Sequence, residues 1–69
     1  MKLNYYPETG SLYIDFSSKT GKESVEISEG IVIDYDDDGH VTGIDIDNAH
    51  HKMDLNEIIL NKIPGSYRT

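Results

Sequence analysis

Five short runs in which apolar and polar residues alternate place the strongest constraint on how this chain can fold. A period of two residues is typical of a β-strand with one buried face, because successive side chains on a strand point to opposite faces. Turn-forming residues separate the runs, most clearly at Pro7, at Gly30 and at the Asp-Gly pair that ends in Gly39. The sequence therefore predicts five strands between about residues 2 and 47, joined by short connections.

The expected sheet is an antiparallel β-meander, because strands with short connections usually pair with their sequence neighbours. One strand is irregular, since Val41 is out of phase with the two isoleucines that follow it. Gly43 lies between them and predicts a β-bulge that restores the phase. The alternating apolar residues then form one inward face, which comprises Leu3, Tyr5, Leu12, Ile14, Phe16, Val25, Ile27, Ile31, Ile33, Ile44 and Ile46.

The residues after the last strand change to a helical period. Asp54 and Glu57 have the spacing of a capping box, in which each side chain bonds a free backbone N–H at the start of a helix. Residues 54–63 are therefore predicted to form a helix that covers the inward face of the sheet, and residues 64–69 a loose tail. The apolar side of this helix comprises Leu55, Ile58, Ile59 and Ile63.

The fold class expected from these elements is α+β: a five-stranded antiparallel β-meander with one short C-terminal helix packed on one face. Residues 1–69 are interpreted as a single domain. A chain this short buries only about 60% of its unfolded surface, and this one has no cysteine for a disulfide. Such domains often depend on a partner subunit, so we expect self-association as a homodimer. The first strand, residues 2–6, is predicted to leave an open edge.

Charge is distributed unevenly along the chain. The net charge is −7, and residues 23–47 hold nine acidic residues without a lysine or arginine. Such a segment repels phosphates, which argues against nucleic-acid binding and favours a basic protein or a divalent cation as the counterpart. The alternative is that the acidic residues serve solubility alone.

The sequence contains no run that resembles a signal peptide and none long and apolar enough to span a membrane. We therefore expect a cytoplasmic protein that makes no membrane contact.

The sheet face opposite the inward one is predicted to be half acidic and half apolar, which is unusual for a surface that meets only solvent. Tyr6 and Tyr13 on this face allow two interpretations, as cross-strand pairs within the sheet or as anchors of an interface. The residues predicted to bind a partner are Tyr13, Glu26, Val32, Asp34 and Asp45.

The acidic run that ends in Gly39 also matches part of a calcium loop. Its aspartates occupy positions one, three and five of the twelve-residue pattern, with Gly39 at position six. The flanking segments are predicted strands, however, whereas an EF-hand has helices there. A solvated hairpin turn is the favoured interpretation of these residues, and calcium is the alternative cofactor. The candidate metal ligands are Asp34, Asp36, Asp38 and Asp45.

No catalytic signature is present. The sequence lacks a Gly-x-Ser-x-Gly elbow, a His-Glu-x-x-His pair, a phosphate-binding glycine loop and cysteine. His50 and His51 would point to opposite faces if they continued a strand, and with His40 they form no recognisable metal site. They are interpreted as surface residues, and the chain is not expected to be an enzyme.

Two blocks of the sequence resemble the YuzE-like family, a bacterial and archaeal domain of unknown function. The run from Tyr5 to Ile14 is similar to the opening of that family, and the run from Gly30 to Ile46 to its second block. The sequence departs from the pattern in carrying two histidines after the last strand, and in Asp45 where relatives often have glutamate. The resemblance implies no catalytic residues. It implies an antitoxin-like role, because some members are encoded beside a small toxin-like protein.

These observations favour a small acidic binding module that engages a basic protein partner through the acidic segment. The competing hypotheses are divalent-cation binding, with calcium as the ion, and a purely structural small domain.

Overall fold

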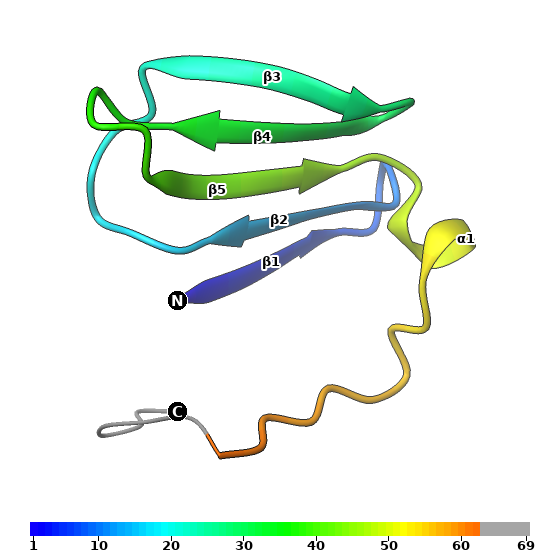
Figure 1. Cartoon of the computed structure of the whole chain (residues 1–69). Coiled ribbons are helices and arrows are strands. Elements are labelled where there is room, and N and C mark those ends of the chain that lie inside the picture. Colours follow the sequence, from blue (N-terminus) through cyan, green and yellow to red (C-terminus); the bar gives the residue numbers. More distant parts are fainter. Residues whose placement is uncertain (63–69) are drawn as a thin grey trace.

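The computed structural model describes residues 1–62, which form one five-stranded antiparallel sheet with a short helix at one end (Figure 1). The elements are β1 (Lys2–Tyr6), β2 (Ser11–Asp15), β3 (Glu23–Ser28), β4 (Ile31–Tyr35), β5 (Val41–Ile46) and α1 (Ala49–Lys52). The α+β class with five antiparallel strands and a short C-terminal helix is confirmed. The predicted tail, residues 64–69, and the last residue of the predicted helix lie outside the described residues.

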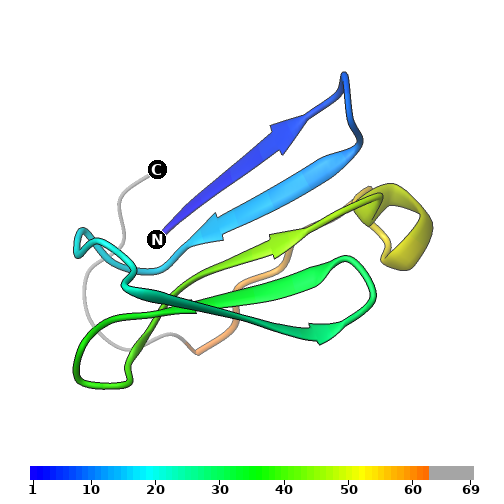
Figure 2. The same ribbon diagram turned by 90° about the horizontal axis from the view of Figure 1, so that it is seen from above.

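The strand order is β1-β2-β5-β4-β3, so the sheet is not a meander throughout. A β1–β2 hairpin lies beside a β3–β4–β5 meander. The predicted meander would pair β2 with β3, but in the structure β2 pairs with β5. The composition of β3 gives a physical reason. Its residues, ESVEIS, are mostly polar. A polar strand is better placed at a solvated edge than in the centre, where a strict meander would put it. The connection from residue 16 to residue 22 crosses one end of the sheet to make this order (Figure 2).

The predicted bulge in β5 is confirmed. Gly43 lies opposite Asp34, but the next pair joins Val41 to Tyr35, so Thr42 is an extra residue on β5. The insertion returns Val41 to the face that carries Tyr35, which lies two residues beyond Ile33 on the same strand. A second irregularity lies in β3 between Glu26 and Ser28.

Cross-strand pairing confirms that most of the predicted apolar residues share one face. Leu12 pairs with Ile46, and Ile14 with Ile44. We call this side the apolar face; its paired residues are Leu3, Tyr5, Leu12, Ile14, Val25, Ile31, Ile33, Ile44 and Ile46. Only its centre is well covered, however. The buried apolar residues are Leu12, Ile46 and Ala49, with Ile14, Ile31, Ile44 and Leu55 packed against them.

The helix lies earlier in the chain than predicted. Asn48 adopts a left-handed backbone conformation (φ 50°), and α1 follows at once. The N–H of Ala49 donates to the carbonyl oxygen of Gly10 at 2.8 Å, so α1 docks on the β1–β2 turn at the end of the sheet. The prediction that the helix covers the apolar face is therefore wrong, because α1 lies at the end of the sheet.

Residues 54–62 are not helical. The carboxylate of Asp54 accepts the N–H of Asn56 at 2.9 Å, which closes a local turn in place of a helix cap. A helix of ten residues is also too short to be stable without packing, and only Leu55 of this segment packs on the core. We call residues 53–62 the C-terminal segment.

Candidate functional site

The five residues predicted to bind a partner lie together on the face opposite the apolar one. Four of them form a row across four strands: Tyr13 pairs with Asp45, Asp45 with Val32, and Val32 with Glu26. Asp34 lies two residues along β4 from Val32, opposite Gly43. We call the surface made by Tyr13, Glu26, Val32, Asp34 and Asp45 the acidic face.

Tyr13 is held across β5 by a hydrogen-bond network. Its hydroxyl donates to one carboxylate oxygen of Asp34 at 3.0 Å, and Ser24 donates to the other at 2.6 Å. Gly43 makes this crossing possible, because a Cβ atom at that position would meet the Tyr13 hydroxyl. The network therefore joins β2, β4 and β3 over a strand that has no side chain at the crossing point.

Sequence reasoning missed the structural roles of Ser24 and Gly43. Gly43 was interpreted only as a sign of the bulge, although a glycine within a strand also marks places where another group approaches the backbone closely. That second meaning could have suggested a covering aromatic residue. Nothing in the local sequence indicates that Tyr13 reaches Asp34, because the contact depends on the β2–β5 pairing.

The carboxylates of the acidic face repel one another. Partial burial raises the pKa of Asp45, and the charges of Asp47 and Asp34 raise it further. Burial likewise raises the pKa of Tyr13, together with its hydrogen bond to Asp34 and the charges of Asp34, Asp15 and Asp45. Ionised Asp45 therefore costs the fold stability at neutral pH.

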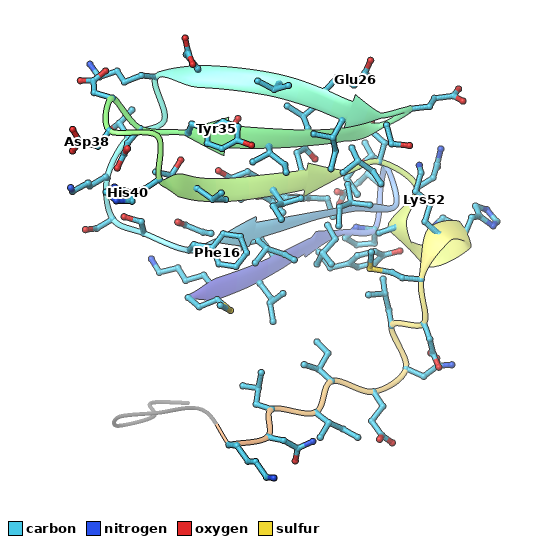
Figure 3. All side chains as sticks on the ribbon, viewed as in Figure 1. Phe16, Glu26, Tyr35, Asp38, His40 and Lys52 are labelled. Carbon is cyan, nitrogen blue, oxygen red and sulfur yellow. The ribbon has the colours of Figure 1, made fainter. Side chains whose placement is uncertain are left out.

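Basic side chains do little to offset this repulsion. Within residues 1–62, the one contact of ion-pair distance joins Asp36 to His40, which carries a charge only when its imidazole is protonated, and it lies in the β4–β5 turn, away from the row on the acidic face. Lys52 of α1 donates to the backbone carbonyl of Asp47, not to a carboxylate. Lys2 lies opposite Asp15 at the β1 edge. Figure 3 shows Glu26 and Lys52 toward one end of the sheet and Asp38 and His40 at the other.

A groove of about 480 Å³ extends the acidic face toward α1. Its lining includes Glu26 and Asp47, with Glu29 at the β3–β4 turn and His51 and Lys52 from the helix. The groove thus adds the carboxylates of Asp47 and Glu29 to the border of the acidic face, and neither residue was among those predicted to bind a partner.

We expect Asp45→Asn to raise the stability of the isolated chain. The pKa of Asp45 lies above its unfolded value, so the fold loses stability as the pH rises through the folded pKa and Asp45 ionises. Asparagine does not ionise and therefore avoids that loss. The gain should be about 0.5 kcal/mol at neutral pH, the scale of a partly exposed charge interaction, and should vanish in acid. Urea unfolding at about pH 7 and about pH 3 measures it. Asp37→Asn, in the exposed turn, is the matched control and should change little.

The β4–β5 turn is organised by Asp36. Its carboxylate accepts the backbone N–H groups of Asp38 and His40, each at 2.9 Å, and lies 3.4 Å from the His40 imidazole Nδ1. The bond from the His40 backbone N–H is the main reason why the pKa of Asp36 lies below its ordinary value, and the Asp38 N–H and the His40 charge act in the same direction. Gly39, at φ 82°, completes the turn.

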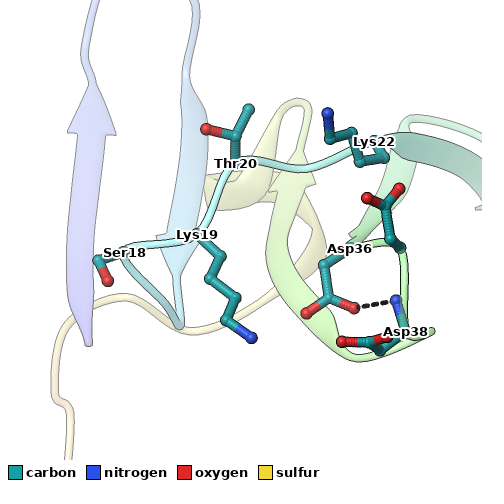
Figure 4. A pocket seen from close by; sticks show the side chains of 7 residues that line it. Ser18, Lys19, Thr20, Lys22, Asp36 and Asp38 are labelled. Carbon is teal, nitrogen blue, oxygen red and sulfur yellow. Dashed lines mark hydrogen bonds between the residues drawn. The ribbon is translucent and has the colours of Figure 1, made fainter.

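The four predicted calcium ligands do not come together as one set, because Asp36 and Asp38 lie in the β4–β5 turn, apart from the other two. Asp34 and Asp45 belong to the acidic face, and both carboxylate oxygens of Asp34 already accept hydrogen bonds. Among the described residues, one group of three acidic or histidine side chains could share an ion. It comprises Asp36, Asp38 and His40, whose ligand atoms all lie within 4.8 Å of one another. This group offers two carboxylates and an imidazole nitrogen, whereas calcium takes six to eight oxygen ligands, which include backbone carbonyls and waters. Lys19 and Lys22 also line the cavity of about 450 Å³ beside this turn (Figure 4).

The adjacent histidines lie on α1 rather than on a strand. The rings of His50 and His51 are 3.9 Å apart, so the strand geometry that would separate them does not apply. Both residues are exposed, which confirms their interpretation as surface residues. No group of three metal-ligating side chains in residues 1–62 includes either of them.

Within residues 1–62, no helix has the length and hydropathy needed to cross a membrane.

Comparison with known protein families finds one match. The family described as "Protein of unknown function (DUF2283)" matches residues 2–50, which cover β1 to β5 and the start of α1. The match spans more than half of the chain, which therefore belongs to this family. The comparisons with curated proteins and with solved structures give no match.

Proposed function

We propose that this member of the DUF2283 family is a binding module whose acidic face engages a basic protein partner. The observation that carries the proposal is the row on the acidic face, where Asp45 and Glu26 flank Val32 and, within residues 1–62, form no ion pair with a lysine or arginine. The raised pKa of Asp45, caused by burial and by the charges of Asp47 and Asp34, agrees with this unbalanced charge. A basic side chain of a partner, placed between these carboxylates, would turn their repulsion into attraction.

The other residues of the acidic face suit such contact. Tyr13 is held in one position by Asp34, so little conformational entropy would be lost when its ring is covered. Val32 supplies apolar surface between Asp45 and Glu26 in the same row. The unneutralised carboxylates would speed encounter with a basic protein by about 10- to 1,000-fold at low salt. Charge thus favours the encounter, while Tyr13 and Val32 stabilise the complex.

The partner class that we favour is a small basic toxin. The resemblance to YuzE-like domains supports an antitoxin-like role, since some of those are encoded beside a small toxin-like protein. An antitoxin-like role would be carried out in the cytoplasm, which is therefore the location that we propose. The proposal includes no catalytic step and no cofactor.

Capture from an extract of the source cells tests this function. We expect the tagged chain to retain a small basic protein, and Asp34→Lys with Asp45→Lys to slow its association by at least about tenfold at low salt. The matched control is Asp37→Lys with Asp38→Lys, which changes the net charge equally but in the exposed turn. Circular dichroism of each variant verifies that the sheet is retained.

Two results would contradict the proposal. One is an extract that yields no basic protein, and the other is equal slowing of association by the acidic-face and turn variants. In either case the carboxylates would act only through net charge, as the solubility hypothesis states.

A further inference from the structure

We propose that the apolar face, together with the C-terminal segment, packs against the same surface of a second copy of this chain to form a symmetric dimer. This inference concerns the opposite side of the sheet from the acidic face and does not depend on the proposed function.

The first observation is that the core of a single chain is incomplete. No large side chain is fully buried among residues 1–62. Leu3 and Tyr5 on β1, and Val25 on β3, are 43–46% exposed although they belong to the apolar face. A groove of about 380 Å³ remains between that face and the C-terminal segment, lined in part by Leu3, Leu55 and Ile58. The segment lies over the face without filling it.

Sheet architecture explains what is missing. Domains are built from at least two layers that bury apolar surface against each other, and residues 1–62 of this chain supply one sheet. Its smallest dimension is 18 Å, with 31 and 32 Å along the other axes. A second copy, packed on this side with its own apolar face and C-terminal segment, would supply the missing second layer.

Charge argues for a second copy over a basic protein on this face. Among the paired residues of the apolar face none is charged, and Glu23, opposite Tyr35, lies at its corner. Asp34, Asp45 and Glu26 point to the other side of the sheet. Two chains of net charge −7 can therefore approach through their apolar faces with the carboxylates of both acidic faces turned outward. Apart from Glu23, a basic partner would find no complementary charge among these paired residues.

The available area is of the size that a dimer requires. Five strands about 4.8 Å apart, each about five residues long, give a face of roughly 400 Å² in projection, and its side chains enlarge the accessible area. Ile58, Ile59 and Leu60 of the C-terminal segment are 58–66% exposed, and burying each removes roughly 100 Å² of apolar surface. Stable complexes bury about 800 Å² on each partner. The face and the segment together offer roughly 700 Å², close to this value, whereas neither alone approaches it, so both belong to the interface.

The dimer would present two acidic faces, one on each outer side. A dimer could then bind two copies of a basic partner, one on each acidic face, or one partner that has two binding sites. This consequence links the two surfaces without making either depend on the other.

The mass of the full chain in solution tests the dimer. Light scattering and sedimentation at rising concentration should give twice the chain mass, and the thermal midpoint should rise with concentration because folding and association are coupled. Added salt should leave the dimer intact or strengthen it, since it screens the repulsion between two acidic chains.

Paired lysine substitutions locate the interface. Ile58→Lys should raise the dimer dissociation constant at least about tenfold, whereas Asn61→Lys in the same segment should change it less than about twofold. Ile58 is 58% exposed in the single chain, so its replacement does not threaten the fold. Leu3→Lys on the apolar face and Asn4→Lys beside it on the opposite face form a second pair with the same expected contrast.

The proposal is overturned if the chain is a monomer with a concentration-independent midpoint at millimolar concentration. In that case the face is left open or is closed within one chain. A dimer that withstands both Ile58→Lys and Leu3→Lys also overturns it, because association would then use another surface such as the edge of β1.

Discussion

Leu12→Ala should lower the free energy of unfolding by about 2–5 kcal/mol, enough to leave much of the chain unfolded at room temperature. Leu12 is only 5% exposed, at the centre of the apolar face, and pairs with Ile46 on β5. Alanine would remove apolar contacts with the facing residues on both neighbouring strands, Tyr5 on β1 and Ile46 on β5, and leave a cavity. Urea unfolding followed by circular dichroism measures the loss.

Leu3→Ala is the matched control, since it makes the same chemical change on the neighbouring strand. Leu3 is 43% exposed, so the loss should be clearly smaller in dilute solution. Equal losses at the two positions would show that Leu12 is not the centre of the core. The stated arrangement of β2 between β1 and β5 would then be wrong.

Gly43→Ala should lower stability by about 1–3 kcal/mol, because the new methyl group meets the Tyr13 ring. The Tyr13 side chain must then leave its position and give up its hydrogen bond to Asp34. A double-mutant cycle isolates this contact. Once Tyr13→Ala has removed the ring, adding Gly43→Ala should cost much less than it does in the parent chain.

Gly39→Ala provides the control for backbone effects. Gly39 has φ 82° and no atom within 4 Å of where a Cβ would stand, so alanine there should cost about 1 kcal/mol of strain. That cost should add to the cost of Tyr13→Ala without coupling. If Gly43→Ala and Tyr13→Ala were also additive, Tyr13 would not lie across β5.

The composition of each sheet face could be predicted from the sequence, because alternation along a strand does not depend on which strand lies next to it. Tyr13, Val32 and Asp45 therefore fall on one face in any strand order. The bulge at Thr42 was likewise predictable, since Val41 and Ile44 are out of phase and a glycine separates them.

The neighbours of each residue could not be predicted in the same way. The contact between Tyr13 and Asp34 requires β2 to pair with β5, which joins residues more than twenty positions apart. Local spacing carries no information about such pairing. The polar character of β3 was the available signal, because it favours an edge position.

The helix was misplaced because one sequence pattern serves two structures. Asp54 can cap a helix or close a local turn with Asn56, and tertiary packing decides between them. Asn48 and Ala49 carried the better signal for α1, since asparagine tolerates a left-handed conformation and Ala49 fits a buried site against Gly10. The Asp36–His40 pairing joins residues only four positions apart within one turn and was within reach of sequence reasoning.

The most direct test of the central claim, that the acidic face is the binding surface, is an amide NMR titration of the labelled chain with a short lysine- and arginine-rich peptide at physiological salt. We predict saturable shifts concentrated at Tyr13, Val32 and Asp45, and much weaker binding by the Asp45→Asn variant. Shifts centred on the exposed Asp37–Asp38 turn, or binding unchanged by Asp45→Asn, would contradict the account.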